Sequence, residues 1–344
     1  MNRSCPLCEN RNPSHLWTIT RFEQPFDIKV CPDCSMIYQD PLPEAHQVEE
    51  LYDQAYYTGQ GGQGRYTYLD ERTNPRGHRA VNRARIRFLL RIWRRLRDPA
   101  SQTPEYPVFL DVGCSFGALV QEAQLAGCDA HGIDISGYAV QEGIRAGLDI
   151  RKATPESLPS WSSPLDLVTM IEVIEHLPDP ASALRSLARA MQPGGILVIQ
   201  TANMDGRQAR RAGSAYHYYL PGHLVYFSRK TLTTMLSQCG FDVVRVSYPC
   251  EFGLRPKLVK SQGTFRSLLD YRKWLTITRY HLMSKLHWGD FAWTSGMVIH
   301  ARRRDAGGRP RRLRCADLAR AQVRAVERAP GWPAGHRRTL RCGL

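Results

Sequence analysis

Two pairs of cysteines near the start of the chain have the spacing of a metal site. Cys5 and Cys8 form one C-x-x-C pair, and Cys31 and Cys34 form the other. Four thiolates in two close pairs suit tetrahedral zinc, and a metal with all four positions filled has a structural role. A dithiol redox pair is the alternative. We predict a zinc ribbon over residues 1–43, because so short a module has no sizeable core of its own.

A turn of small residues carries the second chemical pattern. Asp111, Gly113, Ser115 and Gly117 form D-x-G-x-S-x-G, and Asp134 follows 21 positions after Gly113. The residues of such a turn are small because a ligand must approach the backbone closely. A carboxylate at the place of Asp134 can accept hydrogen bonds from both hydroxyls of a ribose. The pattern predicts a nucleotide-binding site.

The acid that opens this turn indicates which nucleotide it holds. A dinucleotide fingerprint places a pyrophosphate at a helix N-terminus after G-x-G-x-x-G. Asp111 stands at the end of the preceding strand, where it would repel a phosphate but suits an ammonium group. We therefore predict S-adenosylmethionine, whose amino acid moiety carries a cation. An ordinary strand-to-helix turn is the alternative.

The hydrophobic pattern supplies the elements that position these residues. An apolar run at 108–110, a helical pattern at 118–126 and a strand at 130–135 form a βαβ unit. Pro193 to Gly195 read as a turn before a further strand. The fold class is α/β, a Rossmann-like doubly wound seven-stranded sheet. The remaining predicted elements are strands at 148–151, 165–171, 196–201, 241–248 and 292–301 and helices at 137–146, 181–191 and 229–238, the last capped by Ser228.

Two segments outside this pattern are predicted to be helical. Residues 44–104 form a connector with a glycine-rich stretch at 59–64, which is a lid over the site or a surface linker. Its helix at 79–97 has apolar residues on one face and arginines elsewhere. The insertion at about 252–290 is basic and aromatic, and we favour a substrate lid or a homodimer contact over peripheral membrane binding.

Several motifs together resemble one known family. D-x-G-x-x-x-G, G-x-D, D-L-V-x-x-x-E-V-I-E-H-L-P-D-P and P-G-G are similar to class I methyltransferases, the family of ubiquinone-biosynthesis O-methyltransferases and many sugar and natural-product methyltransferases. The similarity covers residues 108–248, so the methyltransferase domain is expected over 105–304. The N-terminal ribbon resembles that of bacterial methyltransferases found with glycan and antibiotic-sugar pathways.

The resemblance implies roles for the residues of the cofactor site. The glycine turn would line the methionine end of the cofactor. Asp134, at the end of the second strand, would bind the ribose, and Glu156 would contact the adenine amino group. Two residues at the end of strand 165–171 would border the site. The residues concerned are Asp111, Gly113, Ser115, Gly117, Asp134, Glu156, Ile171 and Glu172.

A polar and aromatic segment at 216–228 is expected to cover the methyl acceptor. His223 is the first candidate for a general base, His176 the second and His217 the third, because the acceptor hydroxyl must lose its proton. The alternative is that His223 only fixes the loop. Related sugar C-methyltransferases show Y-H-E-H here, whereas only His223 remains of it, which favours oxygen, and after it nitrogen, over carbon as the acceptor atom.

Charge and composition limit the other classes of function. The chain of 344 residues has a net charge of +15, of which +10 lies in residues 301–344, so we expect a basic disordered tail over 305–344 and make nucleic-acid binding the weaker interpretation. A zinc-ribbon RNA methyltransferase and a non-catalytic scaffold remain as alternatives. The sequence offers no run of about 18 apolar residues and no leading apolar segment, so a cytoplasmic protein with a small-molecule acceptor is expected.

Overall fold

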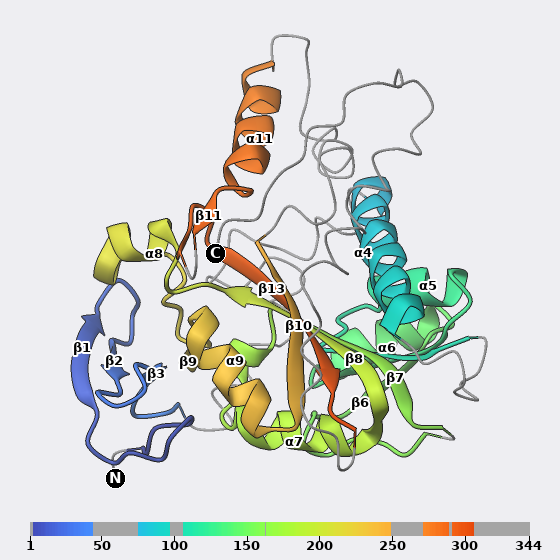
Figure 1. Cartoon of the computed structure of the whole chain (residues 1–344), viewed down its shortest axis with the longest axis horizontal. Coiled ribbons are helices and arrows are strands. Elements are labelled where there is room, and N and C mark those ends of the chain that lie inside the picture. Colours follow the sequence, from blue (N-terminus) through green and yellow to red (C-terminus); the bar gives the residue numbers. More distant parts are fainter. Residues whose placement is uncertain are drawn as a thin grey trace, which may run out of the picture. The chain divides into compact units, whose positions relative to one another are not determined.

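A seven-stranded sheet carries the fold and confirms the predicted α/β class (Figure 1). Its strand order is β10-β13-β8-β7-β4-β5-β6. The pairs from β8 to β6 are parallel, whereas β13 is antiparallel to both β8 and β10. The strands are β4 (Val108–Val112), β5 (Asp129–Asp134), β6 (Asp149–Lys152), β7 (Leu165–Ile171), β8 (Met191–Ala202), β10 (Phe241–Ser247) and β13 (Gly296–Arg303).

The computed structural model describes residues 3–43, 75–96, 106–161, 163–248, 271–288 and 291–305. Contacts group Met1–Ala306 into one compact unit and Gly307–Leu344 into a second. The glycine-rich stretch of the connector at 59–64 lies outside the described residues, as does the tail beyond Asp305.

Helices cover both faces of the sheet, and each strand contributes alternate side chains to each face. Ile196 and Val198 belong to one apolar cluster with α4 (Pro75–Leu96) and α5 (Ala118–Leu125). Leu197 and Ile199 belong to the other cluster, with α7 (Pro180–Ala190) and α9 (Arg229–Gln238). This alternation is the period of two that a strand imposes, and it makes the sheet doubly wound.

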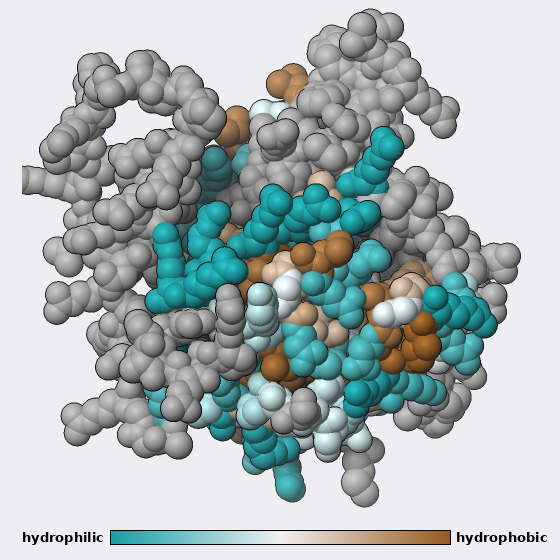
Figure 2. All heavy atoms as spheres, turned by 90° about the vertical axis from the view of Figure 1, so that its right-hand side faces the viewer, coloured by the Kyte–Doolittle hydropathy of each residue, from teal (hydrophilic) through white to brown (hydrophobic). Residues whose placement is uncertain are grey.

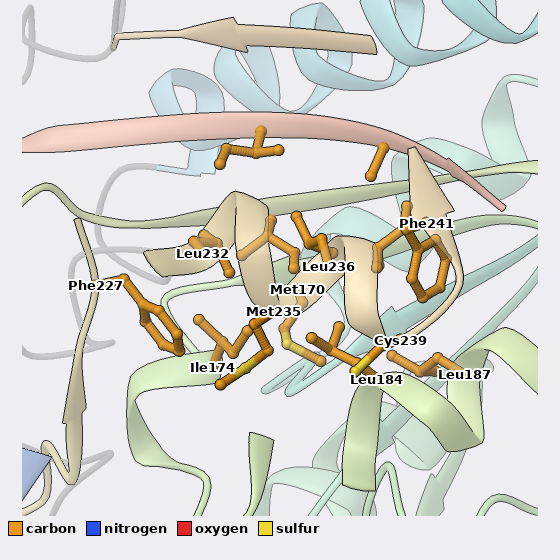
Figure 3. Close-up of a cluster of buried hydrophobic side chains, with 14 of the residues drawn as sticks. Met170, Ile174, Leu184, Leu187, Phe227, Leu232, Met235, Leu236, Cys239 and Phe241 are labelled. Atoms are coloured by element: carbon orange, nitrogen blue, oxygen red, sulfur yellow. The ribbon is translucent and has the colours of Figure 1, made fainter. Parts of the chain in front are cut away.

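The helix α9 shows how the second cluster is closed. Ser228 Oγ accepts from the Thr231 backbone N–H (3.1 Å), and Thr231 Oγ1 accepts from the Ser228 N–H (2.9 Å), which is the predicted N-cap. Figure 3 shows Leu232, Met235 and Leu236 of this helix beside Met170 and the α7 leucines. Burial of this face holds the helix on the sheet.

The amphipathic helix α4 is confirmed, with Ile86, Leu89, Leu90 and Trp93 buried. Its arginines at 83, 87, 91, 94 and 95 are all exposed. The face on which α4 lies is turned to the viewer in Figure 2, where hydrophilic side chains surround smaller apolar patches. These five arginines therefore reach solvent, and Arg83 also donates to Glu122 (3.0 Å), whereas Arg85 is half-buried and donates to Gln200 (3.1 Å).

The N-terminal ribbon joins the rest of the chain through a shared sheet. Its strands β1 (Ser14–Ile19), β2 (Phe26–Val30) and β3 (Ile37–Gln39) continue into β9 (Val225–Tyr226) of the segment expected to cover the acceptor. In the antiparallel β3–β9 pair, Ile37 lies opposite Tyr226 and Tyr38 opposite Val225. This pairing was not predicted, because β9 is too short to show a strand pattern.

Three sequence expectations need correction. Pro193 to Gly195 are not a turn before the strand, because strand β8 already begins at Met191. These residues form an irregularity within β8, where its pairing with β7 shifts register. Ala292 belongs to a small hairpin of β11 (His287–Trp288) and β12 (Phe291–Ala292), so the last strand of the large sheet starts at Gly296. The segment 207–215 was not assigned, yet it forms α8 (Arg207–Ala212) and a 3₁₀ turn (Gly213–Ala215).

The described part of the insertion contains the helix α11 (Tyr271–Met283), so the insertion is helical there. Leu275, Leu282 and Leu286 in and after this helix are exposed. Among the described residues, every helix is too short or too polar to cross a membrane.

The turn after β4 predicts a stability difference between two glycine-to-alanine substitutions. Gly113 and Gly147 both have positive φ angles, 68° and 79°. A Cβ on Gly113 would lie 2.4 Å from Val173 Cγ2, whereas a Cβ on Gly147 has no described atom within 4 Å. Gly147→Ala should cost about 1–2 kcal/mol from the left-handed backbone alone. Gly113→Ala should cost about 1–3 kcal/mol more, because the branched valine is stiff.

Urea unfolding midpoints of both variants test this prediction. Equal destabilisation would show that Val173 moves aside, so that close packing does not define this turn.

Candidate active site

Asp134 holds the glycine turn in place at the carboxyl end of β5. Its carboxylate accepts the backbone N–H of Ser115 on Oδ2 (2.8 Å) and that of Ser136 on Oδ1 (2.9 Å). Gly113 and Cys114 also donate their N–H groups to the Ile133 carbonyl (2.8 and 3.0 Å). Backbone N–H groups thus hold both carboxylate oxygens, at the place where the sequence predicts a ribose.

Ser115 occupies a backbone conformation that glycine adopts more readily than serine. Its φ is 51°, in the left-handed region. Its side-chain oxygen is buried and makes no hydrogen bond within the described part of the chain. A buried hydroxyl without a partner is costly, and a polar ligand atom in this turn would satisfy it. Gly117, with φ 81°, has Leu148 and Ile150 methyl groups 2.5 Å from where a Cβ would stand.

The other predicted cofactor residues lie around the same edge of the sheet. Asp111 in β4 is buried, and Thr169 Oγ1 donates to its Oδ1 (2.6 Å). Ile171 ends β7, and Glu172 follows it. Glu156 is exposed in the turn after β6. Its contact with adenine stays a prediction.

Glu172 forms a hydrogen-bonded group with side chains from two other segments. It has a φ of 54°. Gln200 Nε2 donates to its Oε1 (2.9 Å), and Tyr218 OH lies 2.7 Å from its Oε2. The same Tyr218 hydroxyl contacts Glu175 Oε1, and Thr201 Oγ1 donates to Glu175 Oε2 (2.9 Å). Tyr218 therefore lies between two carboxyl groups.

One phenol proton cannot serve two carboxylates at once, so both contacts are hydrogen bonds only if one carboxyl is protonated. Part of Glu172 is exposed to solvent, but the loss of water around its carboxyl group, followed by the charge of Glu175, raises the pKa of Glu172 to about 7. Burial also raises the pKa of Glu175. A carboxyl that gains and loses its proton near neutral pH suits general acid–base chemistry.

Two of the three candidate histidines lie together. The His176 and His223 rings are 4.6 Å apart between centroids and nearly perpendicular, at 78°. Burial lowers the pKa of His176, and it lowers the pKa of His223 far more strongly. A neutral, buried imidazole with a lowered pKa is a weak base. His217 is exposed and packs on Tyr216 instead.

Tyr218, Thr201 and Gln200 are site residues that the sequence analysis missed. Tyr218 reaches Glu172 across 46 positions of sequence, so no local spacing connects them. Its aromatic segment was recognised, but the direction of each tyrosine depends on the fold.

The four ribbon cysteines come together as predicted. Their sulfur atoms lie within 4.8 Å of one another, with Cys5–Cys34 at 3.4 Å and both Cys8–Cys31 and Cys8–Cys34 at 3.5 Å. Tetrahedral zinc with bonds of about 2.3 Å separates its sulfur ligands by roughly 3.8 Å. The cluster is compatible with that geometry.

Known proteins resemble the same part of the chain. Residues 78–246 match the model of a family described as a methyltransferase domain. The ubiquinone biosynthesis O-methyltransferase of Marinobacter nauticus is 38% identical over 105 residues, which cover 28% of this chain and 44% of the relative. That of Alkalilimnicola ehrlichii is 39% identical over 103 residues, covering 28% and 42%. The chain thus spans less than half the length of these relatives.

Solved structures of similar fold include magnesium protoporphyrin IX methyltransferase from Synechocystis PCC 6803, with a TM-score of 0.46 and 13% identity over 76% of this chain and all 100% of that one. Geranyl diphosphate C-methyltransferase from Streptomyces coelicolor has a TM-score of 0.45 and 13% identity, covering 73% and 90%.

The raised pKa of Glu172 predicts how the free energy of unfolding depends on pH. Because the folded-state pKa is raised from 4.5 to about 7, the stabilisation from this group is complete below pH 4.5 and is lost as the pH rises through 7. Glu172→Gln removes this titration. Because Glu172 is exposed and water screens its charge, the wild type should lose only about 1 kcal/mol or less relative to the variant between pH 5 and pH 8.

Urea unfolding of both proteins across this pH range measures the difference. Parallel pH profiles would mean that Glu172 titrates in the folded protein as it does in the unfolded chain.

Proposed function

We propose that this chain, whose residues 78–246 match a methyltransferase-domain family, transfers a methyl group from S-adenosylmethionine to a hydroxyl oxygen of a small metabolite such as a sugar. The observation that carries the proposal is the meeting of two groups at one edge of the sheet. Asp134 and the glycine turn follow β5 and β4, and the Glu172 group follows the neighbouring β7 and β8. Open α/β sheets bind ligands at this edge.

The cofactor half of the proposal rests on the turn. Asp134 would hold the ribose, and Asp111, Gly113 and Gly117 would line the methionine end. The buried Ser115 hydroxyl, which no described group satisfies, supports a polar ligand at this place. Ile171 and Glu172 would border the sulfonium methyl group.

The acceptor half concerns the proton. In the transfer, the acceptor oxygen bonds to the methyl carbon as the carbon–sulfur bond breaks, and the hydroxyl proton must leave. His223 and His176 were the sequence candidates for the base, but their lowered pKa values weaken them in that role. Glu172, whose pKa is raised to about 7, is better matched to it. We assign the proton to the Glu172 carboxylate.

Zinc in the ribbon belongs to the same proposal. Cys5, Cys8, Cys31 and Cys34 would hold one structural ion, and the sulfur separations support this. The ribbon pairs with β9, so the ion would stabilise the segment over the acceptor rather than take part in the reaction.

Calorimetric titration of S-adenosylmethionine and S-adenosylhomocysteine into the zinc-replete protein tests the cofactor. Wild type should bind both, and Asp134→Ala should lose about 1.5–3 kcal/mol of binding free energy, as expected for a hydrogen-bonding carboxylate. Asp129→Ala is the matched control, because Asp129 is exposed at the opposite end of the same strand. Its affinity should equal that of wild type.

A folded wild type that binds neither compound would contradict the proposal and favour a scaffold that keeps only the fold. Equal losses in both aspartate variants would contradict the ribose role of Asp134.

A further inference from the structure

Arg85 is an arginine of α4 that turns toward the sheet. It is half-buried, whereas Arg83 and Arg87 on either side of it are exposed. Its Nη2 donates to Gln200 Oε1 (3.1 Å), and its Nη1 donates to Oδ1 of the buried Asn82 (3.4 Å), one turn earlier in the helix. The two contacts hold the guanidinium group beside β8.

Gln200 connects Arg85 to Glu172. Its Nε2 donates to Glu172 Oε1 (2.9 Å), and its backbone carbonyl accepts the Glu172 N–H (2.8 Å). Glu172 has a φ of 54°, which is unusual for a residue with a side chain. One residue of β8 therefore holds both the backbone and the carboxyl group of Glu172.

The contact with Arg85 decides which end of the Gln200 amide faces Glu172. An amide has a carbonyl end that accepts and an NH₂ end that donates, and a half-turn of the group exchanges the two ends. A guanidinium group has five N–H donors and no acceptor, so it can face only the carbonyl end. The NH₂ end is thus left on the side of Glu172.

This orientation favours one charge state of Glu172. An N–H donor beside a carboxyl group stabilises the ionised form, whereas a carbonyl oxygen in the same place accepts only from the protonated form. The loss of water and the charge of Glu175 raise the pKa of Glu172, and the hydrogen bond from Gln200 lowers it. A reversed amide would therefore favour uptake of a proton by Glu172. The remaining ionisable groups that reach Glu172 by contact or by charge are Tyr216, Tyr218 and His176.

We propose that Arg85 is a positioning residue that acts through Gln200 and keeps Glu172 in its carboxylate form beside the cofactor. This inference rests on the proposed function, in which Glu172 borders the sulfonium methyl group. S-adenosylmethionine has a positive charge at that sulfur and S-adenosylhomocysteine has none, so the carboxylate favours the methyl donor over the demethylated product. The carboxylate is also the form that can accept the proton of the acceptor hydroxyl.

Calorimetric titration of S-adenosylmethionine and S-adenosylhomocysteine into full-length, zinc-replete protein at pH 7 and pH 9 tests this role. The measured quantity is the ratio of the two affinities. In Arg85→Met the preference for S-adenosylmethionine should fall about three- to tenfold at pH 7. It should return toward the wild-type value at pH 9, where Glu172 ionises in either orientation of the amide. A purely structural role of Arg85 would weaken both compounds at both pH values.

Arg87→Met is the matched control, because it removes the same charge from an exposed position two residues along the same helix. Its affinity ratio should equal that of wild type at both pH values. Arg85→Gln replaces Arg85→Met if the latter does not fold, since a glutamine can present either end of its own amide and fixes no orientation.

A second set of variants tests whether Arg85 acts through Gln200. Gln200→Met removes the amide, so the addition of Arg85→Met to it should change the affinity ratio no further. In urea unfolding, the double variant should lose less stability than the sum of the losses in the two single variants, because both remove the same hydrogen bond.

An affinity ratio that is equal in wild type and Arg85→Met at pH 7 would overturn the positioning role and leave the methyltransferase proposal standing. An equal fall in Arg87→Met would also overturn it, because the charge of the helix would then be the cause. Additive losses in urea would show that Arg85 does not act through Gln200. A wild type that binds neither compound contradicts the methyltransferase and the cofactor preference together, and the urea measurement then decides the contact between Arg85 and Gln200 on its own.

Discussion

The hydrogen bonds of the buried Glu175 join the large sheet to the segment at 216–228. Its carboxylate binds Thr201 of β8 and Tyr218, and its backbone carbonyl accepts the Leu224 N–H (2.7 Å). The Leu224 carbonyl in turn accepts the Gln39 N–H of the ribbon (3.0 Å). A buried carboxylate is stable only when its oxygens accept hydrogen bonds, so the Glu175 side chain ties β8 to the segment at 216–228. Its backbone carbonyl links the same segment, through Leu224, to the ribbon.

The ribbon thereby becomes part of the site's architecture. Besides the β3–β9 pair, the Arg21 guanidinium donates to the carbonyls of Ser214 and Tyr216 (3.0 Å each) and to that of Tyr219. Tyr216, Tyr219 and Tyr226 share an apolar cluster with Ile19 and Ile28 of the ribbon. The ribbon therefore holds Tyr216, Tyr219 and Tyr226 in place, although it lies far from them in sequence.

The cofactor and acceptor halves of the site differ in how they are built. The turn from β4 to α5 is local, because its shape depends on small residues and on Asp134, which lies within the same βαβ unit. The acceptor half is assembled from β7, β8 and the segment before β9, so its polar groups meet only after the sheet has formed. The turn can therefore form from local contacts, whereas the group around Glu172 depends on the tertiary fold.

The sequence alone determined the α/β class, the βαβ unit, the Ser228 cap and the cysteine cluster, because these depend on periodicity and on short spacings. Tertiary structure decided the pairing of Glu172 with Tyr218, the edge-to-face contact of His176 with His223 and the junction of β3 with β9. Each of these joins residues that are distant in sequence, and the direction of a side chain in a loop follows from packing. Burial also changed the chemistry of the groups, lowering the pKa of His223 and raising that of Glu172, which no pattern of residue types records.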